Sequence, residues 1–145
     1  LGAAQFAVPG AVDRLRAERE PADAAPLVLA ATDPAQPYGA ALAWPSSEGR
    51  PARAAGALVV LADGEALAYL ERGGHRLVRF PAAEHDHRWA GALADLVERG
   101  RFRSLELRTI DGTSVNESPP EVRAALEQAG FQQAYKGWTR RSRTS

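Results

Sequence analysis

Residues 57–80, ALVVLADGEALAYLERGGHRLVRF, contain three short apolar runs separated by two glycine-containing turns. The runs cover residues 57–61, 66–70 and 76–80, and Asp63-Gly64 and Gly73-Gly74 lie between them. Asp-Gly and Gly-Gly pairs accept the positive φ angles of a tight hairpin turn at little steric cost. The pattern therefore predicts an antiparallel β-meander.

The sequence before the meander predicts two more strands and an exposed loop. Residues 27–31 form a compact apolar run, which predicts a buried strand. Two prolines and a glycine in residues 32–39 predict an ordered turn. Residues 40–44 are expected to form a short strand. Residues 45–54 are rich in Pro, Ser, Gly and Arg, which predicts an exposed loop.

A short amphipathic helix is predicted further upstream, at residues 11–20. Val12 and Leu15 lie three positions apart, and charged side chains occupy most of the other positions. Pro21 ends the helix, because proline lacks the N–H that a helix interior requires.

Beyond the meander the apolar period changes to that of a helix. Residues 84–99 carry one apolar face, and Gly100 is well placed to end the helix. That face consists of Trp89, Leu93, Leu96 and Val97. Residues 104–110 alternate apolar and polar side chains, which predicts a strand with one wet face.

A second helix and a last strand complete the predicted fold. Ser118-Pro119-Pro120-Glu121 has the spacing of a capping box with proline at the first helical position. The helix is expected to stop at Gly130, and residues 131–139 to form the last strand. The fold class is thus α+β: an antiparallel meander or partial barrel packed with two or three helices, followed by a C-terminal α-β-α-β segment.

Composition places the chain among ordinary globular domains. Its 145 residues suit a single domain spanning 1–145, with a tail at 140–145 expected to fray. Eighteen basic and eighteen acidic residues give no net charge, so any nucleic-acid contact must rest on a local patch. The absence of cysteine excludes disulfides and thiolate metal sites and fits a cytoplasmic protein. No signal peptide or membrane-spanning stretch is apparent, so no membrane partner is expected.

Several cofactor motifs are absent. The chain contains neither the phosphate-binding loop of ATPases nor the glycine fingerprint of dinucleotide-binding folds, and it lacks the nucleophile elbow of hydrolases. We therefore expect no cofactor within these residues.

A metal site is weighed and not favoured. His85-Asp86-His87, with His75 as a third ligand, is the only histidine-rich grouping. Two histidines two positions apart on a helix point in nearly opposite directions, so they share an ion only in an extended segment. A polar helix start, with Asp86 near the positive end of the helix dipole, is the favoured interpretation.

Asp33 is the candidate catalytic residue. It follows a predicted strand in a proline-rich turn close to Tyr38, where a carboxylate could be held rigidly for acid–base work. The structural alternative is an Asx turn, because Asp before Pro often accepts a hydrogen bond from the backbone. The alternative is favoured, since a single carboxylate is a weak signal.

The C-terminal tail is the candidate nucleic-acid contact. Residues 135–143, YKGWTRRSR, combine aromatic side chains with four cations, which suits base stacking together with phosphate contacts. A solvated C-terminus with a core tryptophan explains the same residues equally well. The candidate binding residues are Tyr38, Lys136, Trp138, Arg140, Arg141 and Arg143.

Several segments together resemble the far C-terminal part of the Lhr (large helicase-related) family of bacterial superfamily 2 DNA helicases. The most distinctive are ATDPAQPYG at 31–39 and the GALVVL…YLERGG hairpin between 56 and 74. Further similarity lies in QFAVPGAVDRLR at 5–16, IDG at 110–112 and AGF at 129–131, so the resemblance covers nearly the whole chain.

The resemblance implies a parent protein with an ATP- and magnesium-dependent motor that acts on single-stranded DNA near the nucleoid. The motor would lie upstream of these residues. It also implies relationship to DNA glycosylases that unhook interstrand crosslinks, and some members are linked to uracil removal from DNA. Three functions follow: an accessory domain that contacts DNA or acts as a scaffold for the rest of the parent chain, part of a glycosylase site containing Asp33, or a module for homo-oligomerisation. The first is favoured.

Overall fold

The computed structural model describes residues 25–142. The predicted helix at 11–20 and the candidate Arg143 lie outside the described residues. The first half contains strands β1 (Leu27–Ala30), β2 (Leu58–Ala62), β3 (Glu65–Leu70) and β4 (Arg76–Arg79), the single-turn helix η2 (Pro81–Ala83) and helix α2 (Arg88–Glu98). The second half contains β5 (Ser104–Leu107), β6 (Thr109–Ile110), β7 (Thr113–Ser114), η3 (Val115–Glu117), α3 (Pro120–Gln128), β8 (Gln132–Gln133) and β9 (Trp138–Arg141).

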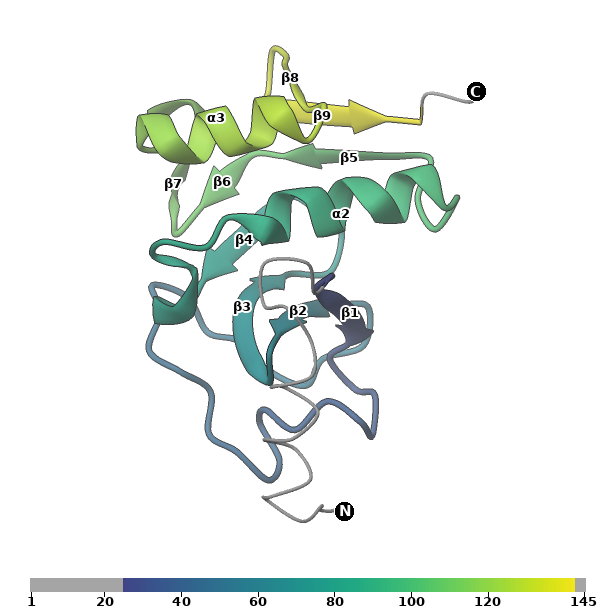
Figure 1. The fold of residues 1–145 in the computed structure, drawn as a ribbon, viewed down its shortest axis with the longest axis vertical. Helices are drawn as coiled ribbons and strands as arrows, with labels where there is room; N and C mark the ends of the chain where they lie inside the picture. Colours follow the sequence, from purple (N-terminus) through teal and green to yellow (C-terminus); the bar gives the residue numbers. More distant parts are fainter. Residues whose placement is uncertain (1–24, 143–145) are drawn as a thin grey trace.

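Two sheets and two α-helices give the described residues a mixed α+β fold, as the sequence predicted (Figure 1). The larger sheet has the strand order β1-β2-β3-β4-β6-β7, and its first four strands pair antiparallel. The predicted meander is β2-β3-β4. Strands β4 and β6 pair in parallel, so the sheet is mixed, and it does not close into a barrel.

Both hairpin turns of the meander use the backbone conformation that their residues favour. Asp63 and Gly64 have φ angles of 53° and 82°, and Gly73 and Gly74 have φ angles of 96° and 79°. In the two-residue turn at Asp63-Gly64, positive φ at both central residues matches the right-handed twist of the flanking strands. The turn chemistry therefore fixes the register that places alternate side chains on opposite faces.

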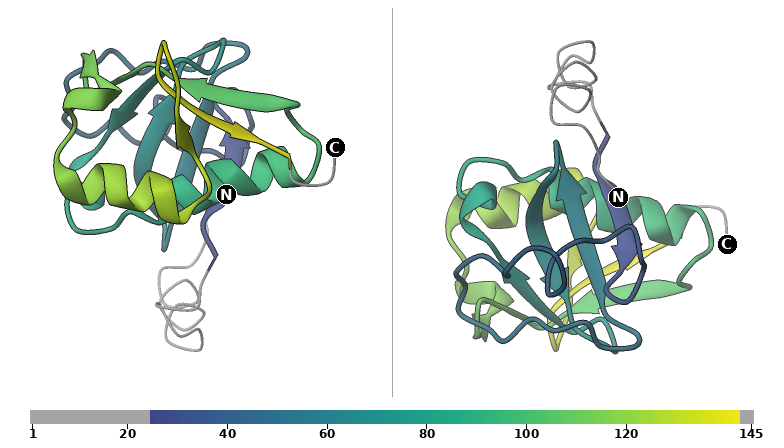
Figure 2. Two further views of the ribbon diagram at one scale, coloured as in Figure 1. Left: turned by 90° about the horizontal axis from the view of Figure 1, so that it is seen from above. Right: turned by 90° about the horizontal axis from the view of Figure 1, so that it is seen from below.

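The β2 strand is buried at all five positions because both faces of the larger sheet are covered. Leu58 and Val60 face the main core with α2, while Val59 and Leu61 face a smaller core with Tyr38 and Trp44. Helices α2 and α3 and the smaller sheet cover the first face, and the segment between β1 and β2 covers the second (Figures 1 and 2).

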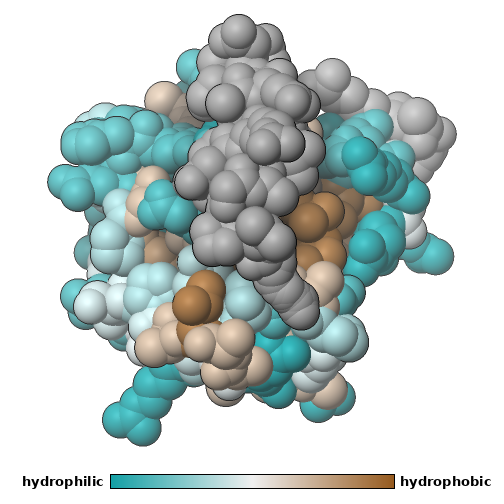
Figure 3. All heavy atoms as spheres, turned by 60° about the horizontal axis from the view of Figure 1, so that its bottom comes forward, coloured by the Kyte–Doolittle hydropathy of each residue, from teal (hydrophilic) through white to brown (hydrophobic). Residues whose placement is uncertain are grey.

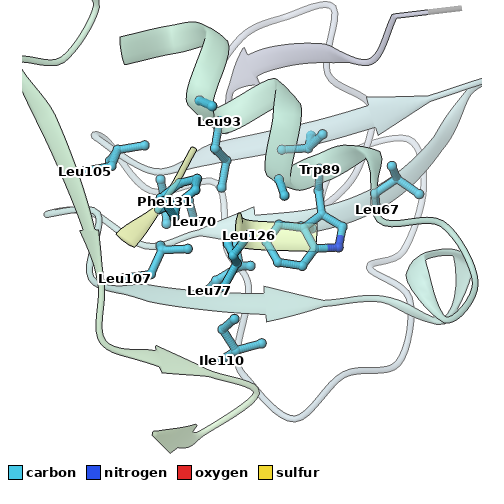
Figure 4. Packing of buried hydrophobic residues seen from close by; sticks show 14 of the residues in the cluster. Leu67, Leu70, Leu77, Trp89, Leu93, Leu105, Leu107, Ile110, Leu126 and Phe131 are labelled. Atoms are coloured by element: carbon cyan, nitrogen blue, oxygen red, sulfur yellow. The ribbon is translucent and has the colours of Figure 1, made fainter. Parts of the chain in front are cut away.

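The main core is centred on side chains that α2 points at the sheets (Figure 4). Trp89 and Leu93 are fully buried there, on the helical face that the apolar spacing predicted. Gly100 ends the helix with a φ of 80°, as expected for a residue just past a helix C-terminus. The helix begins at Arg88, four residues later than predicted, because the preceding residues form η2 and a bend.

The segment before the meander differs from the prediction in two places. Strand β1 is present, but it lies at the sheet edge, and Leu27 is 57% exposed. Residues 40–44 form no strand; a single bridge joins Tyr38 to Leu42. The loop at 45–54 has no regular secondary structure, yet it is tied down where the Tyr69 hydroxyl donates to the Ala52 carbonyl at 3.0 Å.

The predicted strand at 104–110 is divided between the two sheets. Strand β5 pairs with β9 in the smaller sheet, whereas β6 pairs with β4 in the larger one. Arg108, between them, donates its backbone N–H to the His75 carbonyl at 2.8 Å. The alternating pattern runs unbroken through this crossover, so the pattern alone could not reveal the change of sheet.

The last two elements also differ in detail. Helix α3 has Pro120 at its first position as expected, but Pro119 occupies its N-cap and no side chain caps the helix, so the predicted capping box is wrong. Ser118 instead ends η3. The predicted strand at 131–139 is a hairpin: β8 pairs with β9, and residues 134–137 form the turn. Arg140 and Arg141, placed in the tail that was expected to fray, belong to β9.

Candidate nucleic-acid interface

The candidate residues of the C-terminal tail alternate between the core and the solvent along β9. Trp138 and Arg140 are buried, whereas Arg141 is exposed, as the two-residue period of a strand requires. Lys136 lies in the β8–β9 turn and is exposed, and its neighbour Tyr135 is 96% exposed. The exposed aromatic of the tail is therefore Tyr135 and not Trp138.

The buried Trp138 anchors the hairpin. Its indole Nε1 donates to Oδ1 of Asn116 at 2.9 Å, and the same oxygen accepts from Gln133 Nε2 at 3.0 Å. Gly137 packs so closely on β5 that a Cβ there would lie 2.0 Å from the Leu107 carbonyl oxygen. The turn that carries Tyr135 is thus held firmly while its side chain points into solvent.

Arg140 is a buried structural cation. Its guanidinium forms an ion pair with Glu98 of α2 at 2.8 Å, and its Nε donates to the Ala129 carbonyl at the end of α3 at 2.9 Å. Only 4% of the residue is exposed. The Arg140 side chain therefore joins α2, α3 and β9. Because its guanidinium group is buried in these contacts, it is not available to bind a phosphate.

Three exposed arginines gather where α2 and β9 end; we call Arg101, Arg103 and Arg141 the arginine end. Ser104 is the register partner of Arg141, and Arg103 directly precedes Ser104 in the chain. The C-terminal ends of α2 and β9 lie close to each other in Figures 1 and 2. Within residues 25–142, none of the three guanidinium groups forms an ion pair, whereas nearby Arg99 pairs with Asp95 at 2.6 Å.

Two of these arginines were not predicted from the sequence. Arg101 and Arg103 belong to RGRFR at 99–103, directly after the glycine that ends α2. The three arginines in these five residues could have indicated a binding site, but a solvated helix end explains such a run just as well. Their proximity to Arg141 depends on the pairing of β5 with β9.

An acidic residue lies near Lys136. A hydrogen bond from Arg108, 2.5 Å from the Glu106 carboxylate, lowers the pKa of Glu106, and the charges of His75 and Lys136 act in the same direction. Glu106 therefore stays ionised at neutral pH and offsets part of the positive charge at the hairpin. No residue of the arginine end forms an ion pair with an acidic residue among those that the structure describes.

Asp33 is held by an Asx turn. Its Oδ1 accepts the Ala35 backbone N–H at 2.8 Å, as the structural interpretation predicted. The surrounding loop is strongly ordered: Arg53 donates to the carbonyls of Asp33 and Gln36 at 3.1 and 2.6 Å. The buried amide of Gln36 donates to the Ala31 carbonyl at 2.9 Å.

Tyr38 belongs to the smaller core and is 8% exposed. Its ring stacks on Trp44 with centroids 6.0 Å apart, and its hydroxyl donates to the Gly64 carbonyl at 3.1 Å. Burial raises the pKa of this hydroxyl above its ordinary value. The side chain offers no open ring face on which a base could stack.

The structure does not bring the two sets of candidate residues together. Tyr38 packs in the core on one face of the larger sheet, and Trp138 packs in the core on the other. The segment containing Asp33 lies at the opposite end of the long axis from hairpin β8–β9 (Figure 1). A single cleft that combines Asp33 with the tail cations is thus absent from the described residues.

The histidines do not form a metal centre. His75 Nδ1 lies 2.9 Å from the Glu106 carbonyl, and His85 is exposed beside Glu84. Asp86 is engaged by Arg88 at 2.8 Å, and this hydrogen bond lowers the pKa of the Asp86 carboxyl. In the part of the chain that the structure describes, no three potential ligands cluster closely enough to hold an ion.

The features described so far define a small α+β domain with exposed arginines near the ends of α2 and β9. No protein-family model matches the chain. It is 50% identical over 136 residues to a protein named "Lhr helicase/ probable uracil glycosylase" from Mycolicibacterium smegmatis. It is 33% identical over 149 aligned positions to "Lhr helicase/uracil glycosylase" from Escherichia coli.

These matches cover 88% and 94% of the chain but only 9% of each relative, so the chain spans about a tenth of their length. The matched part is the C-terminal region of the larger proteins. The chain belongs to the Lhr family and corresponds to that C-terminal region, which confirms the resemblance seen in the sequence. None of the helices between residues 25 and 142 is long and apolar enough to cross a membrane.

Proposed function

We propose that this domain is an accessory domain of an Lhr-type DNA helicase and that it contacts single-stranded DNA through the arginine end. The observation that supports this proposal is that Arg101, Arg103 and Arg141 are exposed near the ends of α2 and β9 and form no ion pair with an acidic residue among those described. Guanidinium groups bind phosphate oxygens in bidentate fashion, and unpaired ones need no ion pair broken first.

A local patch is the form that DNA contact must take in this chain. The net charge is zero, so the domain as a whole exerts no strong attraction on a polyanion. Three neighbouring arginines still supply a positive potential at short range, where salt screens it least. The parent motor, with its ATP and magnesium, would supply movement, and this domain would hold the strand.

The exposed tip of hairpin β8–β9 supports contact with bases as well as phosphates. Tyr135 presents an open aromatic face beside Lys136. Stacking of a base on an aromatic side chain is tolerant of sequence and requires an unpaired strand. The proposal therefore favours single-stranded over duplex DNA.

The test is binding of the 145-residue chain to a fluorescein-labelled single-stranded oligonucleotide, followed by anisotropy across a range of salt concentrations. We expect Arg101→Gln/Arg103→Gln to weaken binding about tenfold at low salt, since two phosphate contacts are lost. The slope of log K against log salt should fall in magnitude by about 1.4, which is about 0.7 for each contact with a single strand.

Arg50→Gln/Arg72→Gln is the matched control, because both arginines are exposed and lie outside the arginine end. This variant removes the same charge and should retain both the affinity and the salt slope of the unmodified chain. Equal losses in the two double variants would contradict a specific role for the arginine end and indicate a general charge effect.

A second candidate function is participation in a base-excision site. The names of both relatives include uracil glycosylase, and a carboxylate could activate water or steady the charge that develops on the sugar during excision. Asp33 is the candidate because its rigid loop holds a partly exposed carboxylate. This proposal is independent of the arginine end, since the two lie at different ends of the domain.

A further inference from the structure

A polar hollow of about 370 Å³ lies on hairpin β8–β9, next to the arginine end. Its lining includes Gln132, Thr139 and Arg141. Gly130 and Ala134, on either side of Gln132 in the sequence, also line the hollow and add little bulk. The volume lies within the range of about 300–1,000 Å³ that small-molecule sites occupy. The hollow can therefore hold a ligand group of modest size.

Strand pairing places the polar lining on the face of the smaller sheet that points away from the main core. Gln132 and Thr139 are register partners across β8 and β9, so their Cβ atoms lie about 4.5–5.5 Å apart. Arg141 lies two positions beyond Thr139 and shares its face, because successive side chains of a strand alternate. Trp138 and Arg140, which alternate with them, are buried on the opposite face. The three lining side chains thus point to one open surface.

Two of these side chains have hydrogen-bonding capacity that the fold leaves unused. Neither the Gln132 amide nor the Thr139 hydroxyl forms a side-chain hydrogen bond within residues 25–142. By contrast, the amide of the neighbouring Gln133 donates to Asn116 Oδ1 at 3.0 Å. An amide side chain supplies both donors and an acceptor, and a hydroxyl can do either. The hollow therefore suits a ligand whose edge carries donors and acceptors together.

We infer that the hollow holds one unpaired DNA base, whose edge forms hydrogen bonds with the Gln132 amide and the Thr139 hydroxyl. This inference rests on the proposed contact with single-stranded DNA and adds which part of the strand is read. A base outside a duplex presents its whole hydrogen-bonding edge to a protein. Arg141, about 7 Å along β9 from Thr139, binds the adjoining phosphate.

Adenine is the favoured base, because a glutamine amide matches its edge. Adenine presents a donor and an acceptor side by side, and glutamine forms a bidentate pair with them. The phosphate contacts of the arginine end are the same for every sequence and set the affinity without selecting a base. Gln132 is therefore the residue that determines the base preference.

A DNA strand fits the hollow better than a protein segment does. Among the described residues that line it, none has a large apolar side chain. The large aliphatic side chains that are exposed in the described part of the chain, Leu27 and Leu42, both precede the meander. Figure 3, which brings the lower end of Figure 1 forward, shows apolar patches there. The hollow instead offers hydrogen bonds and the charge of Arg141, which complements a phosphate backbone.

The test compares the binding of the 145-residue chain to two fluorescein-labelled strands of equal length by anisotropy. One is oligo-dT, and in the other every second dT is replaced by dA. We expect the dA-containing strand to bind about fivefold more tightly, at the low end of what a bidentate base contact provides. Gln132→Met keeps the length of the side chain without its amide and should abolish this preference. The salt slope should stay unchanged, because no phosphate contact is lost.

Gln133→Met is the matched control, because it removes the same amide one position along β8, where that amide bonds to Asn116. This variant should keep the preference for dA, and an equal loss in both variants would overturn the inference. Salt-dependent binding with no preference, or a preference that survives Gln132→Met, would also overturn it while leaving the proposed DNA contact in place. Absence of binding to either strand would contradict the proposed function itself, and the inference with it.

Discussion

The Asp33 carboxylate accepts a structural hydrogen bond, and it is also the candidate catalytic group of the glycosylase proposal. Its Oδ1 accepts the Ala35 N–H, and this single hydrogen bond explains why Asp precedes Pro34 in the turn. Nothing in the fold requires the residue to be charged. Asparagine offers the same acceptor without the charge, so one substitution separates the structural role from a chemical one.

Asp33→Asn should leave the thermal unfolding midpoint of the chain unchanged within about 1 °C, because the turn hydrogen bond is retained. The glycosylase proposal predicts that the same substitution in the full-length parent lowers uracil excision at least 100-fold, the usual contribution of an acid or base. The measurement is single-turnover excision from a uracil-containing oligonucleotide.

Asp33→Ala serves as the comparison, since it removes both the charge and the acceptor. It should cost about 1 kcal/mol of folding free energy in addition. Excision that survives Asp33→Asn at the normal rate would rule out the catalytic role and leave the Asx turn as the function of this residue.

Arg140 joins three secondary-structure elements, because it holds α2 and the end of α3 against β9. Its partners are the Glu98 carboxylate and the Ala129 carbonyl. Removing one member of a buried ion pair leaves the other charged and poorly solvated. The cation that looked like part of a binding tail is therefore expected to contribute mainly to stability.

Arg140→Met should lower the free energy of unfolding by about 2–3 kcal/mol, a value discounted because Glu98 keeps partial access to water. Arg141→Met, one position along the same strand, should change it by less than about 0.5 kcal/mol because that side chain is exposed. Urea unfolding followed by circular dichroism measures both. Similar losses in the two variants would show that Arg140 has no special structural role.

The whole described body has two cores that share one sheet. Val60 contributes to the main core and Val59 to the smaller one, so neither core survives without β2. This arrangement predicts that the chain unfolds as a single cooperative domain. Thermal curves from far-ultraviolet circular dichroism and from tryptophan fluorescence should coincide, because Trp44 and Trp89 report on different cores.

Two separate transitions would contradict this prediction and would show that the segment between β1 and β2 unfolds independently. Such behaviour would bear on the candidate sites, because Asp33 and Tyr38 belong to that segment while Arg101 and Arg141 do not. A chain with Trp44→Phe provides the control, since its fluorescence reports only on the main core.

Local patterns were sufficient for most elements of the fold. The Asp-Gly and Gly-Gly turns have the positive φ that these residues favour, and the spacing of Trp89, Leu93, Leu96 and Val97 is that of one helix face, so both features were predicted correctly. The family resemblance was likewise readable from short segments. These properties depend on neighbours in sequence, and short-range sterics and periodicity determine them.

The candidate site depended on contacts between residues far apart in the chain. The pairing of β5 with β9 brings the end of β9, with Arg141, next to Ser104 at the start of β5, and the ion pair with Glu98 of α2 holds Arg140 inward. An alternating pattern predicts that successive side chains of a strand face opposite ways. The elements that pack on the strand determine which of the two faces is buried. The sequence therefore specified most of the strands and helices, and tertiary packing decided which arginines are buried and which remain exposed.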